Sequence, residues 1–447
     1  MDPATGSPGP DGRPTTRLPN RELIRISLYW LGLSSIFAGL GTILSGRLEF
    51  TGLVDKQDAG RALFLVSISG AVIAMLVQPT IGSISDYTIS RWGRRKPYIL
   101  IGSVLDLAFL AGIASSNTLV ALATFIALLQ FSSNFAQGPF QGYVPDLVPA
   151  AQVGTASALV GLMQVLGNVA GFVIGAIATA TNQFGLGLIA LGILELVTML
   201  SVVIRVREGP PPKSRAGRPW RAIAAEAWGT DILGEPSFLW LVASRLAILM
   251  GGSVLVQLAT FYLSRSMGLN QADTGLVLIP LTGLVAVGTV VSVVPAARLS
   301  DRVGRKRVIW TSCAIGTTGL AIVAVAPNLA VAFLGALVYG ISAGIFLAVD
   351  WALLTDIIPK ASTGRYMGLS NVATASSGVL AAAFGGTLMD IVGGPQAGGL
   401  GPRAALGLGV VLLGVGAILL RPVDERRRED RIAAAALDLA SAEVVVS

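Results

Sequence analysis

Four ionisable residues lie inside long apolar stretches of this chain of 447 residues, and they are the first candidates for chemistry. They are Asp106, Glu195, Arg245 and Asp350. A charged group at the centre of a membrane helix costs ~2.5–3.5 kcal/mol on insertion scales, so each one indicates a functional site. Arg245 lies about ten residues into its stretch, which at ~1.5 Å per residue is ~15 Å deep. We therefore expect Arg245 to contact a substrate or a coupling residue near the bilayer midplane.

Proton coupling in this chain must use a carboxylate, because the sequence contains no histidine. Asp350 is the first candidate, since it belongs to the same half of the chain as Arg245 and its protonation would loosen a pair between them. A static salt bridge is the alternative. Asp106 and Glu195 are further candidates for coupling, although either could instead bond to a hydroxyl or an amide of a neighbouring helix.

A solute rich in hydroxyl groups would need amide and aromatic side chains around its cavity, because these exchange hydrogen bonds with water at small net cost. Asn134, Gln137 and Gln141 follow spacings of three and four residues, which place them on one helical face. The same face could instead hold two helices together. The other candidates for substrate contact are Tyr29, Trp30, Gln257, Trp351 and Asn371.

No enzyme active site is predicted. The sequence contains no GxxxxGK[ST] phosphate-binding loop. Its single cysteine, Cys313, can form neither an intrachain disulfide nor a cysteine metal cluster. We expect no cofactor and no bound metal.

The composition places these residues in an all-α membrane protein that crosses the bilayer several times. Hydrophobic residues make up 53% of the chain and charged residues 13%, and the mean hydropathy is +0.73. Since one span needs ~20 apolar residues, we predict about twelve transmembrane helices. Their ranges are 23–45, 62–81, 97–114, 119–145, 154–179, 185–205, 236–263, 272–297, 308–326, 329–355, 364–391 and 404–421.

The basic residues indicate the orientation. If the N-terminus is cytoplasmic, the loops on the outer side hold few of the 32 lysines and arginines. They are Arg47, Lys56, Arg61, Arg265 and Arg403. Because basic residues concentrate on the cytoplasmic side, we expect both termini there, in a plasma or inner membrane. The placement of the basic residues relative to the lipid bilayer thus explains the net charge of +7, which does not indicate nucleic-acid binding. We expect a monomer with a small-molecule substrate.

Five segments are predicted along the chain. Residues 1–22 form a disordered cytoplasmic tail, and 23–205 form an N-terminal bundle of six helices. Residues 206–235 form a cytoplasmic loop with an interfacial helix near Trp220. A C-terminal six-helix bundle at 236–421 and a cytoplasmic tail at 422–447 follow.

One charged loop occurs in both halves. GSISDYTISRWGRRK, over Gly82 to Lys96, is repeated in shorter form as ARLSDRVGRKR, over Ala297 to Arg307. The DLVP that begins at Asp146 recurs as the DIIP that begins at Asp356. The halves are therefore expected to be parallel repeats of about six helices each.

The residue types in these loops suit a gate on the cytoplasmic side. Asp86 can accept hydrogen bonds from the N-terminus of a facing helix, which we expect to be the eleventh, and Arg94 and Arg95 can reach Asp146. The alternative is that the arginines serve only as topology signals. The predicted gating residues are Gly82, Asp86, Gly93, Arg94, Arg95 and Asp146 in the first half, and Asp301, Arg302, Gly304, Arg305 and Asp356 in the second.

These loops resemble the signature G-x-x-x-D-R-x-G-R-R of the major facilitator superfamily. The six residues between Asp86 and Gly93, and the Pro97-Tyr98 that follows the basic cluster, are similar to sucrose and proton symporters and to sugar transporters of the glycoside-pentoside-hexuronide type. GPFQGYVPD also resembles their helix-four segment GPxRAxxxD. Gln141 stands where those symporters carry an arginine implicated in proton coupling.

The resemblance implies the major facilitator fold, with two six-helix repeats around a central cavity and rocker-switch alternating access. It also implies secondary active transport, with a sugar or glycoside imported together with a proton. One alternative is a proton-driven exporter of lipophilic compounds, although the fifth helix lacks the Gly-Pro pair usual in such exporters. A second alternative is a membrane protein that senses a ligand, or delivers a pigment or lipid, without transport.

Overall fold

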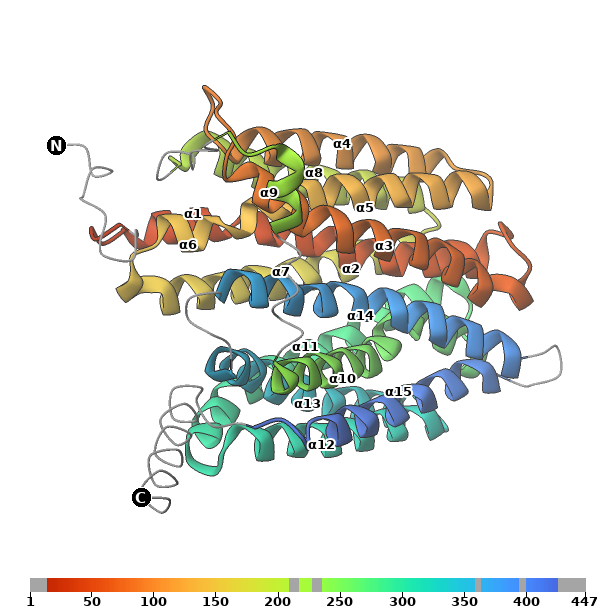
Figure 1. Ribbon diagram of the computed structural model, residues 1–447. Helices are drawn as coiled ribbons and strands as arrows, with labels where there is room; N and C mark the ends of the chain where they lie inside the picture. Colours follow the sequence, from red (N-terminus) through yellow and green to blue (C-terminus); the bar gives the residue numbers. More distant parts are fainter. Residues whose placement is uncertain (1–13, 209–216, 227–234, 358–362, 394–398, 425–447) are drawn as a thin grey trace, which may run out of the picture. The chain divides into compact units, whose positions relative to one another are not determined.

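The structure is a computed structural model that describes residues 14–208, 217–226, 235–357, 363–393 and 399–424 (Figure 1). Within these ranges every regular element is a helix. In the described part of the chain, eleven helical segments are long and apolar enough to cross a membrane, and a shorter apolar segment, Ser376–Val392, lies within α14 (Thr363–Val392). The prediction of an all-α protein with twelve spans is confirmed.

The helix boundaries follow the predicted spans closely. In the first half the helices are α1 (Asn20–Ser27), α2 (Tyr29–Phe50), α3 (Ala59–Ser85), α4 (Lys96–Ser115), α5 (Leu119–Gln141), α6 (Tyr143–Leu147), α7 (Val153–Ala180) and α8 (Phe184–Arg205). After the short α9 (Trp220–Glu226) come α10 (Pro236–Phe261), α11 (Gln271–Val303), α12 (Arg305–Val325), α13 (Leu329–Ile357), α14 and α15 (Leu400–Leu419). Trp228, at the end of the predicted interfacial helix, lies outside the described residues.

Two predicted spans are interrupted. The first span is divided at Leu28 into α1 and α2, and the fourth is divided at Gly142 into α5 and α6. At Gly142 the guanidinium of Arg95 occupies the space that a larger side chain would need. After this break, Asp146 of α6 pairs with Arg94 and Arg95 of the first charged loop.

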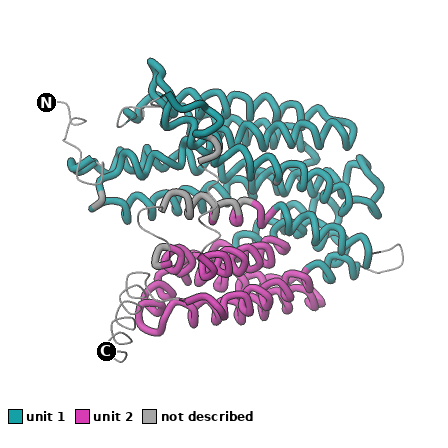
Figure 2. Tube along the Cα trace, in the orientation of Figure 1, with its two compact units in different colours: residues 1–228, 256–283, 379–405 teal, residues 229–255, 284–378, 406–447 magenta. Residues whose placement is uncertain are grey.

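Contacts divide the chain into two compact units (Figure 2). Unit 1 consists of residues 1–228, 256–283 and 379–405, and unit 2 of residues 229–255, 284–378 and 406–447. Four helices of the second sequence half, α10, α11, α14 and α15, contribute residues to both units. Unit 1 therefore contains the first six spans together with end segments of four later ones.

Small residues bring the helices of unit 1 together. The main pairs are α2 with α7, α3 with α5, and α4 with α5 and α8. A side chain at Gly167 or Gly171 of α7 would collide with backbone carbonyls of α2, at Leu31 and Ser35. Close approach of this kind lets helices pack tightly where the surrounding lipid is as apolar as the side chains.

In unit 2, hydroxyl groups donate to backbone carbonyls between helices. Ser312 of α12 and Ser342 of α13 each donate to the other's carbonyl, at 3.0 and 2.7 Å. Thr289 of α11 donates to the carbonyl of Gly340 at 3.1 Å. Such bonds are a usual means of joining helices inside a membrane.

Candidate functional site

The first charged loop folds into a network of ion pairs in unit 1. Arg95 Nη2 lies 2.7 Å from Asp86 Oδ1 and 2.7 Å from Asp146 Oδ2. Its Nη1 donates to the carbonyl of Pro139 at 2.6 Å. Arg94 also pairs with Asp146. These contacts agree with the predicted reach of both arginines to Asp146, and they give Asp86 an arginine of its own loop as a donor. We call Asp86, Arg94, Arg95 and Asp146 the loop cluster.

Sequence reasoning misses Glu208, which follows α8 and holds the start of α4. Its carboxylate accepts hydrogen bonds from the backbone amides of Arg94, Arg95 and Lys96, the last at 2.6 Å. Tyr143 donates its hydroxyl to the same carboxylate at 3.1 Å. The first amides of a helix have no partner within the helix, and the helix dipole favours an anion there. The only sequence signal is that Glu208 is the one acidic residue among the basic residues of 206–218.

The two signature glycines of the first loop lie in different surroundings. Gly93 has φ +109°, and the carboxylate of Glu208 lies where its Cβ would be. A residue with a side chain would be strained there and would displace Glu208. Gly82 of α3 faces Gly138 of α5, where a Cβ at Gly82 would lie at an ordinary contact distance of 3.4 Å from the carbonyl oxygen of Gly138, whereas a Cβ at Gly138 would collide with the carbonyl oxygen of Gln78.

Asp106 of α4 and Glu195 of α8 come together inside unit 1. Both residues are fully buried, and their carboxyl groups lie within hydrogen-bonding reach of each other. Both oxygens of Asp106 accept hydrogen bonds from α5, one from Ser132 and the other from Ser133 at 2.7 Å. Among the described residues, Oε2 of Glu195 accepts no hydrogen bond. The sequence predicted two separate coupling candidates, and the structure places them in one site.

Tyr29 completes this carboxyl pair. Its hydroxyl donates to Oε1 of Glu195 at 2.8 Å and lies 2.5 Å from the hydroxyl of Ser103. Tyr29 was predicted to line the substrate cavity, whereas the structure buries it completely. Its ring meets Phe140 edge to face at 4.8 Å between centroids, and Phe140 packs on Tyr143 at 5.4 Å. Aromatic contacts thus join the carboxyl pair to the residue that bonds Glu208.

Unit 2 contains a buried ion pair. Arg245 Nη1 lies 3.2 Å from Asp350 Oδ2, and each side chain is 3% exposed. The same nitrogen donates to Ser370 at 2.9 Å, and the guanidinium carbon lies 5.0 Å from the ring centroid of Trp351. Within the described part of the chain, Nε of Arg245 and Oδ1 of Asp350 have no hydrogen-bond partner. Three predicted site residues therefore meet here, with one donor and one acceptor unused.

The end of unit 1 that is far from the loop cluster carries another ion pair, between Glu49 and Arg265. Arg265 donates from Nε and Nη2 to Oε2 of Glu49 at 2.9 and 2.6 Å, and Ser264 donates to Oε1 at 3.0 Å. Glu49 is 3% exposed. Arg265 lies in a π-helical turn, Tyr262–Ser266, at the end of α10. Such turns are rare and occur often at functional sites.

Further contacts at this end join the first-half helices to segments of the second half. Ser45 of α2 donates to the carbonyl of Gln257 at 3.0 Å. The backbone amide of Arg61 donates to Asp390 Oδ2 at 2.7 Å. In unit 1, this end is therefore closed by contacts between segments that lie far apart in the sequence.

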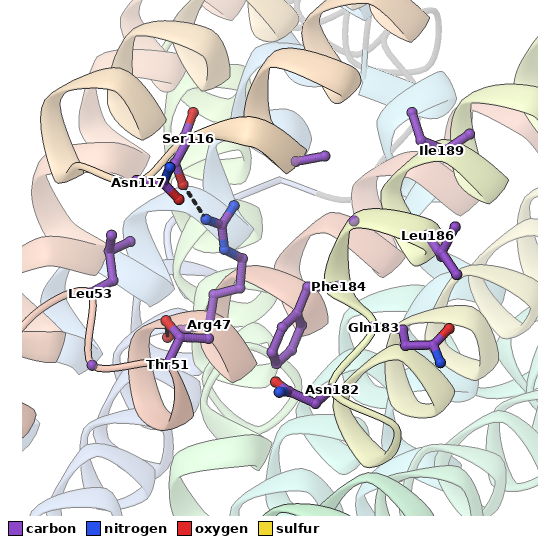
Figure 3. Close-up of a pocket in the computed structure, with 13 residues that line it drawn as sticks. Arg47, Thr51, Leu53, Ser116, Asn117, Asn182, Gln183, Phe184, Leu186 and Ile189 are labelled. Atoms are coloured by element: carbon purple, nitrogen blue, oxygen red, sulfur yellow. Dashed lines mark hydrogen bonds between the residues drawn. The ribbon is translucent and has the colours of Figure 1, made fainter.

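A hollow of about 740 Å³ also lies at this end, next to Arg47 (Figure 3). Neutral polar residues such as Asn117, Asn182 and Gln183 line it. Arg47 is 8% exposed, and its guanidinium donates to the last carbonyls of α4, at Ile113 and Ser116. The Arg47 guanidinium therefore caps the C-terminal end of α4.

Comparison with known proteins identifies the family. The family model described as Major Facilitator Superfamily matches residues 26–292 and 246–444. The chain belongs to the Major Facilitator Superfamily. This confirms the resemblance seen in the loop signature, and it makes the protein a member of a transporter family.

Relatives within the superfamily include sugar transporters. Over 173 residues the chain is 32% identical to the sucrose transport protein SUT1 of Oryza sativa subsp. japonica, covering 33% of this chain and 32% of that protein. It is 28% identical over 223 residues to proton-associated sugar transporter A of Homo sapiens, covering 44% of this chain and 29% of that protein. The matched stretches thus span about a third of each relative.

Solved superfamily structures share the fold. A bacterial homologue of the human lysosomal transporter Spinster, in an inward-facing and occupied conformation, has a TM-score of 0.71 and 14% identity over 90% of this chain and 96% of that one. The nucleoside transporter NupG has a TM-score of 0.61 and 15% identity over 90% of this chain and 98% of that one. Both likenesses show the major facilitator fold alone.

The remaining predicted residues are dispersed. Asn134 is 2% exposed and donates its amide to the carbonyl of Gln130 in its own helix, while Gln137 and Gln141 are half-buried. Trp30 packs on Phe140. The side-chain amide of Gln257 lies against Gly41.

In the second copy of the superfamily loop, Asp301 and Arg302 are exposed and Gly304 has φ +96°. Arg305 is half-buried at the start of α12. The side chains of Asn371 and Asp356 lie outside the described part of the structure.

Proposed function

We propose that the protein is a secondary active transporter that imports a sugar or a glycoside together with a proton, by alternating access. Membership of the Major Facilitator Superfamily and the matches to sucrose transporters support this proposal. The observation that carries it is the buried pair of Arg245 and Asp350 in unit 2, with Trp351 beside the guanidinium.

This group has the chemistry that a polyhydroxyl ligand requires. Nε of Arg245 offers an unused donor, and Oδ1 of Asp350 offers an unused acceptor. Trp351 is 40% exposed and presents an aromatic surface beside the guanidinium. A sugar hydroxyl can both donate and accept, so it could satisfy both unused atoms. A few polar groups beside an aromatic surface are typical of small-molecule sites.

The same pair can link a proton to movement. Arg245 stays charged, because guanidinium does not lose its proton in proteins. When Asp350 takes up a proton, its attraction to Arg245 is lost and α10 and α13 are held less tightly in unit 2. Proton binding at Asp350 would therefore favour a different helix arrangement, which is what coupling requires.

Alternating access also needs an end that opens and closes. The Glu49 and Arg265 pair joins α2 to the π-helical turn after α10, and we assign it to a gate at the end expected to face outward. Opening that end would separate the two charges. Glu49→Gln should therefore raise the labelling of cysteines placed at this end, in a Cys313→Ser background, whereas Asp55→Asn should not, because Asp55 is exposed.

Uptake of radiolabelled sucrose and of a panel of glycosides into proteoliposomes with an alkaline interior tests the proposal. We expect accumulation that a protonophore abolishes. Asp350→Asn should lose accumulation but keep exchange between equal substrate pools, because exchange requires no net proton release. Arg245→Lys should impair both, because an ammonium group cannot reproduce the planar donors of guanidinium.

Asp55→Asn is the matched control, since it removes one exposed carboxylate and should behave as the wild type. Accumulation by Asp350→Asn at the wild-type rate would exclude Asp350 from coupling. The absence of uptake of every sugar and glycoside by the wild type would reject the substrate class. Uptake that ignores the pH gradient would reject proton coupling.

A further inference from the structure

We infer that Asp106 and Glu195 form a second proton site, in which the two carboxyl groups hold one proton between them and Tyr29 positions Glu195. This inference rests on the proposed proton-coupled transport for its role, but the site can be tested without a substrate. It differs from the Arg245 and Asp350 pair in that it contains no cation.

The geometry requires a proton. Two carboxyl groups in hydrogen-bonding reach cannot both be ionised at low cost, because like charges repel and burial removes the water that would solvate them. Both residues are 0% exposed. A proton on one group allows it to donate to the other, and Oε2 of Glu195 is the oxygen left without a partner among the described residues. One bound proton therefore explains both the contact between the two carboxyl groups and the unpaired Oε2 of Glu195.

Every element packed around the pair presents neutral groups to it. Helix α4 contributes Asp106 and Ser103, α8 contributes Glu195, and α2 contributes Tyr29. Helix α5 contributes two serine hydroxyls, and neither α5 nor α7 contains a charged residue.

The nearest basic residues on the same helices are remote or already paired. Lys96 on α4 and Arg205 on α8 lie about ten residues from the two carboxyl groups, which is ~15 Å along a helix. Arg25, one turn before Tyr29, is paired with Glu22. No described basic side chain thus contacts the pair, and a proton must balance its charge.

The contacts favour a proton over a metal cation. A hard metal cation would need several oxygen ligands around it and would lie between the two carboxylates. Here the carboxyl groups contact each other, and Ser132 and Ser133 direct their hydroxyl hydrogens at Asp106, as donors to a carboxyl group and not as ligands of a cation.

Infrared difference spectroscopy of the full-length protein in lipid tests the site directly. We expect the wild type to show a protonated carboxyl band at neutral pH that disappears on alkaline titration. Asp106→Asn with Glu195→Gln should remove this band, whereas Asp350→Asn should keep it. Tyr29→Phe should shift the frequency of the band, because it removes the hydroxyl that bonds Glu195 and keeps the ring that packs on Phe140.

Transport by the same variants tests the role. The double variant imitates a permanently loaded site, so the dependence of exchange on pH should become weaker, with Asp350 still titrating, and the proton-to-substrate ratio, measured from reversal potentials, should fall by one. If the double variant does not fold, Asp106→Asn alone still tests the site, because it removes one of the two carboxyl groups.

An unchanged band in the double variant and in Asp106→Asn would overturn the site. Loss of the band with an unchanged pH dependence of exchange and an unchanged proton-to-substrate ratio would overturn the role of the site in coupling. Disappearance of the band on addition of sodium at constant pH would show a metal cation in place of the proton. A wild type that shows the band but transports no sugar would reject the proposed substrate and leave the proton site standing.

Discussion

The two charged loops share a sequence pattern, but the structure uses them differently. In the first loop, Arg94 and Arg95 are 7% and 6% exposed and are paired with carboxylates. In the second, Asp301 and Arg302 are exposed. Lys306, which matches Arg95 in the motif, donates to backbone carbonyls at the end of α15.

Loop length accounts for the difference. The first loop leaves the helix at Asp86, and α4 begins at Lys96, so the chain between them can fold back beneath the helix ends. In the second loop α11 continues through Val303, and only Gly304 separates it from α12. In a connection this short, Arg302 stays on the helix surface, and Arg305 is half-buried at the start of α12. A shared motif therefore predicts a shared position in the fold, whereas loop length decides how its first residues are exposed.

The largest effect should come from Glu208, which has no counterpart among the described contacts of the second loop. Glu208→Gln replaces an anion that serves three backbone amides by a neutral group. Hydrogen bonds to charged groups are worth ~1.5–3 kcal/mol each, so we expect roughly 2 kcal/mol less stability and a severe loss of transport. Thermal unfolding in detergent, monitored by tryptophan fluorescence, measures the loss of stability. Asp301→Asn is the control and should stay within ~0.5 kcal/mol. Equal losses in both variants would contradict the contrast.

The next effect concerns the loop cluster itself. Arg94→Ala and Asp86→Asn should each slow transport about tenfold with near-normal expression, because each removes one charge from a partly buried set of ion pairs. Arg302→Ala in the second loop should remain close to the wild type. Initial uptake rates, and cysteine labelling on the cytoplasmic side, measure the effect. Unchanged labelling and flux in the first-loop variants would mean that the arginines act only as topology signals.

A charge exchange then tests the pairs. Arg94→Asp combined with Asp146→Arg should recover part of what each single variant loses, with a coupling of ~0.5–3 kcal/mol. Recovery stays partial because Arg95 also contacts Asp146. The same exchange at Arg305 and Asp356 measures whether the second repeat has an equivalent pair, and the repeat predicts partial recovery there too. Strictly additive losses at Arg94 and Asp146 would show that these residues do not interact.

The smallest effect belongs to Lys306. Lys306→Met removes donors to the carbonyls of Arg421 and Val423 but keeps an apolar stem over Trp310. A cation at a helix C-terminus is worth ~0.3–1 kcal/mol, so the unfolding midpoint should fall slightly and transport should persist. A loss as large as that of Glu208→Gln would indicate that the second loop is also a structural centre.

The sequence alone determined the helices, their order, the two loops and the family. These follow from local features. A span needs a continuous apolar stretch whatever surrounds it, and the loop signature is contiguous. The reach of Arg94 and Arg95 to Asp146 could also be predicted, because the signature and the repeated Asp-x-x-Pro occur at corresponding helix ends in both halves.

Only the tertiary structure decided which charges meet. Asp106 and Glu195 lie on α4 and α8, and Glu208 serves amides more than a hundred residues earlier in the chain. Glu49 and Arg265 are still farther apart. A helix surrounded by lipid and by other apolar helices has apolar residues on all sides, so its sequence does not show which face points inward. The packing of small residues sets that rotation, and with it the carboxyl pair, the ion pair of Arg245 and the contacts of Glu208.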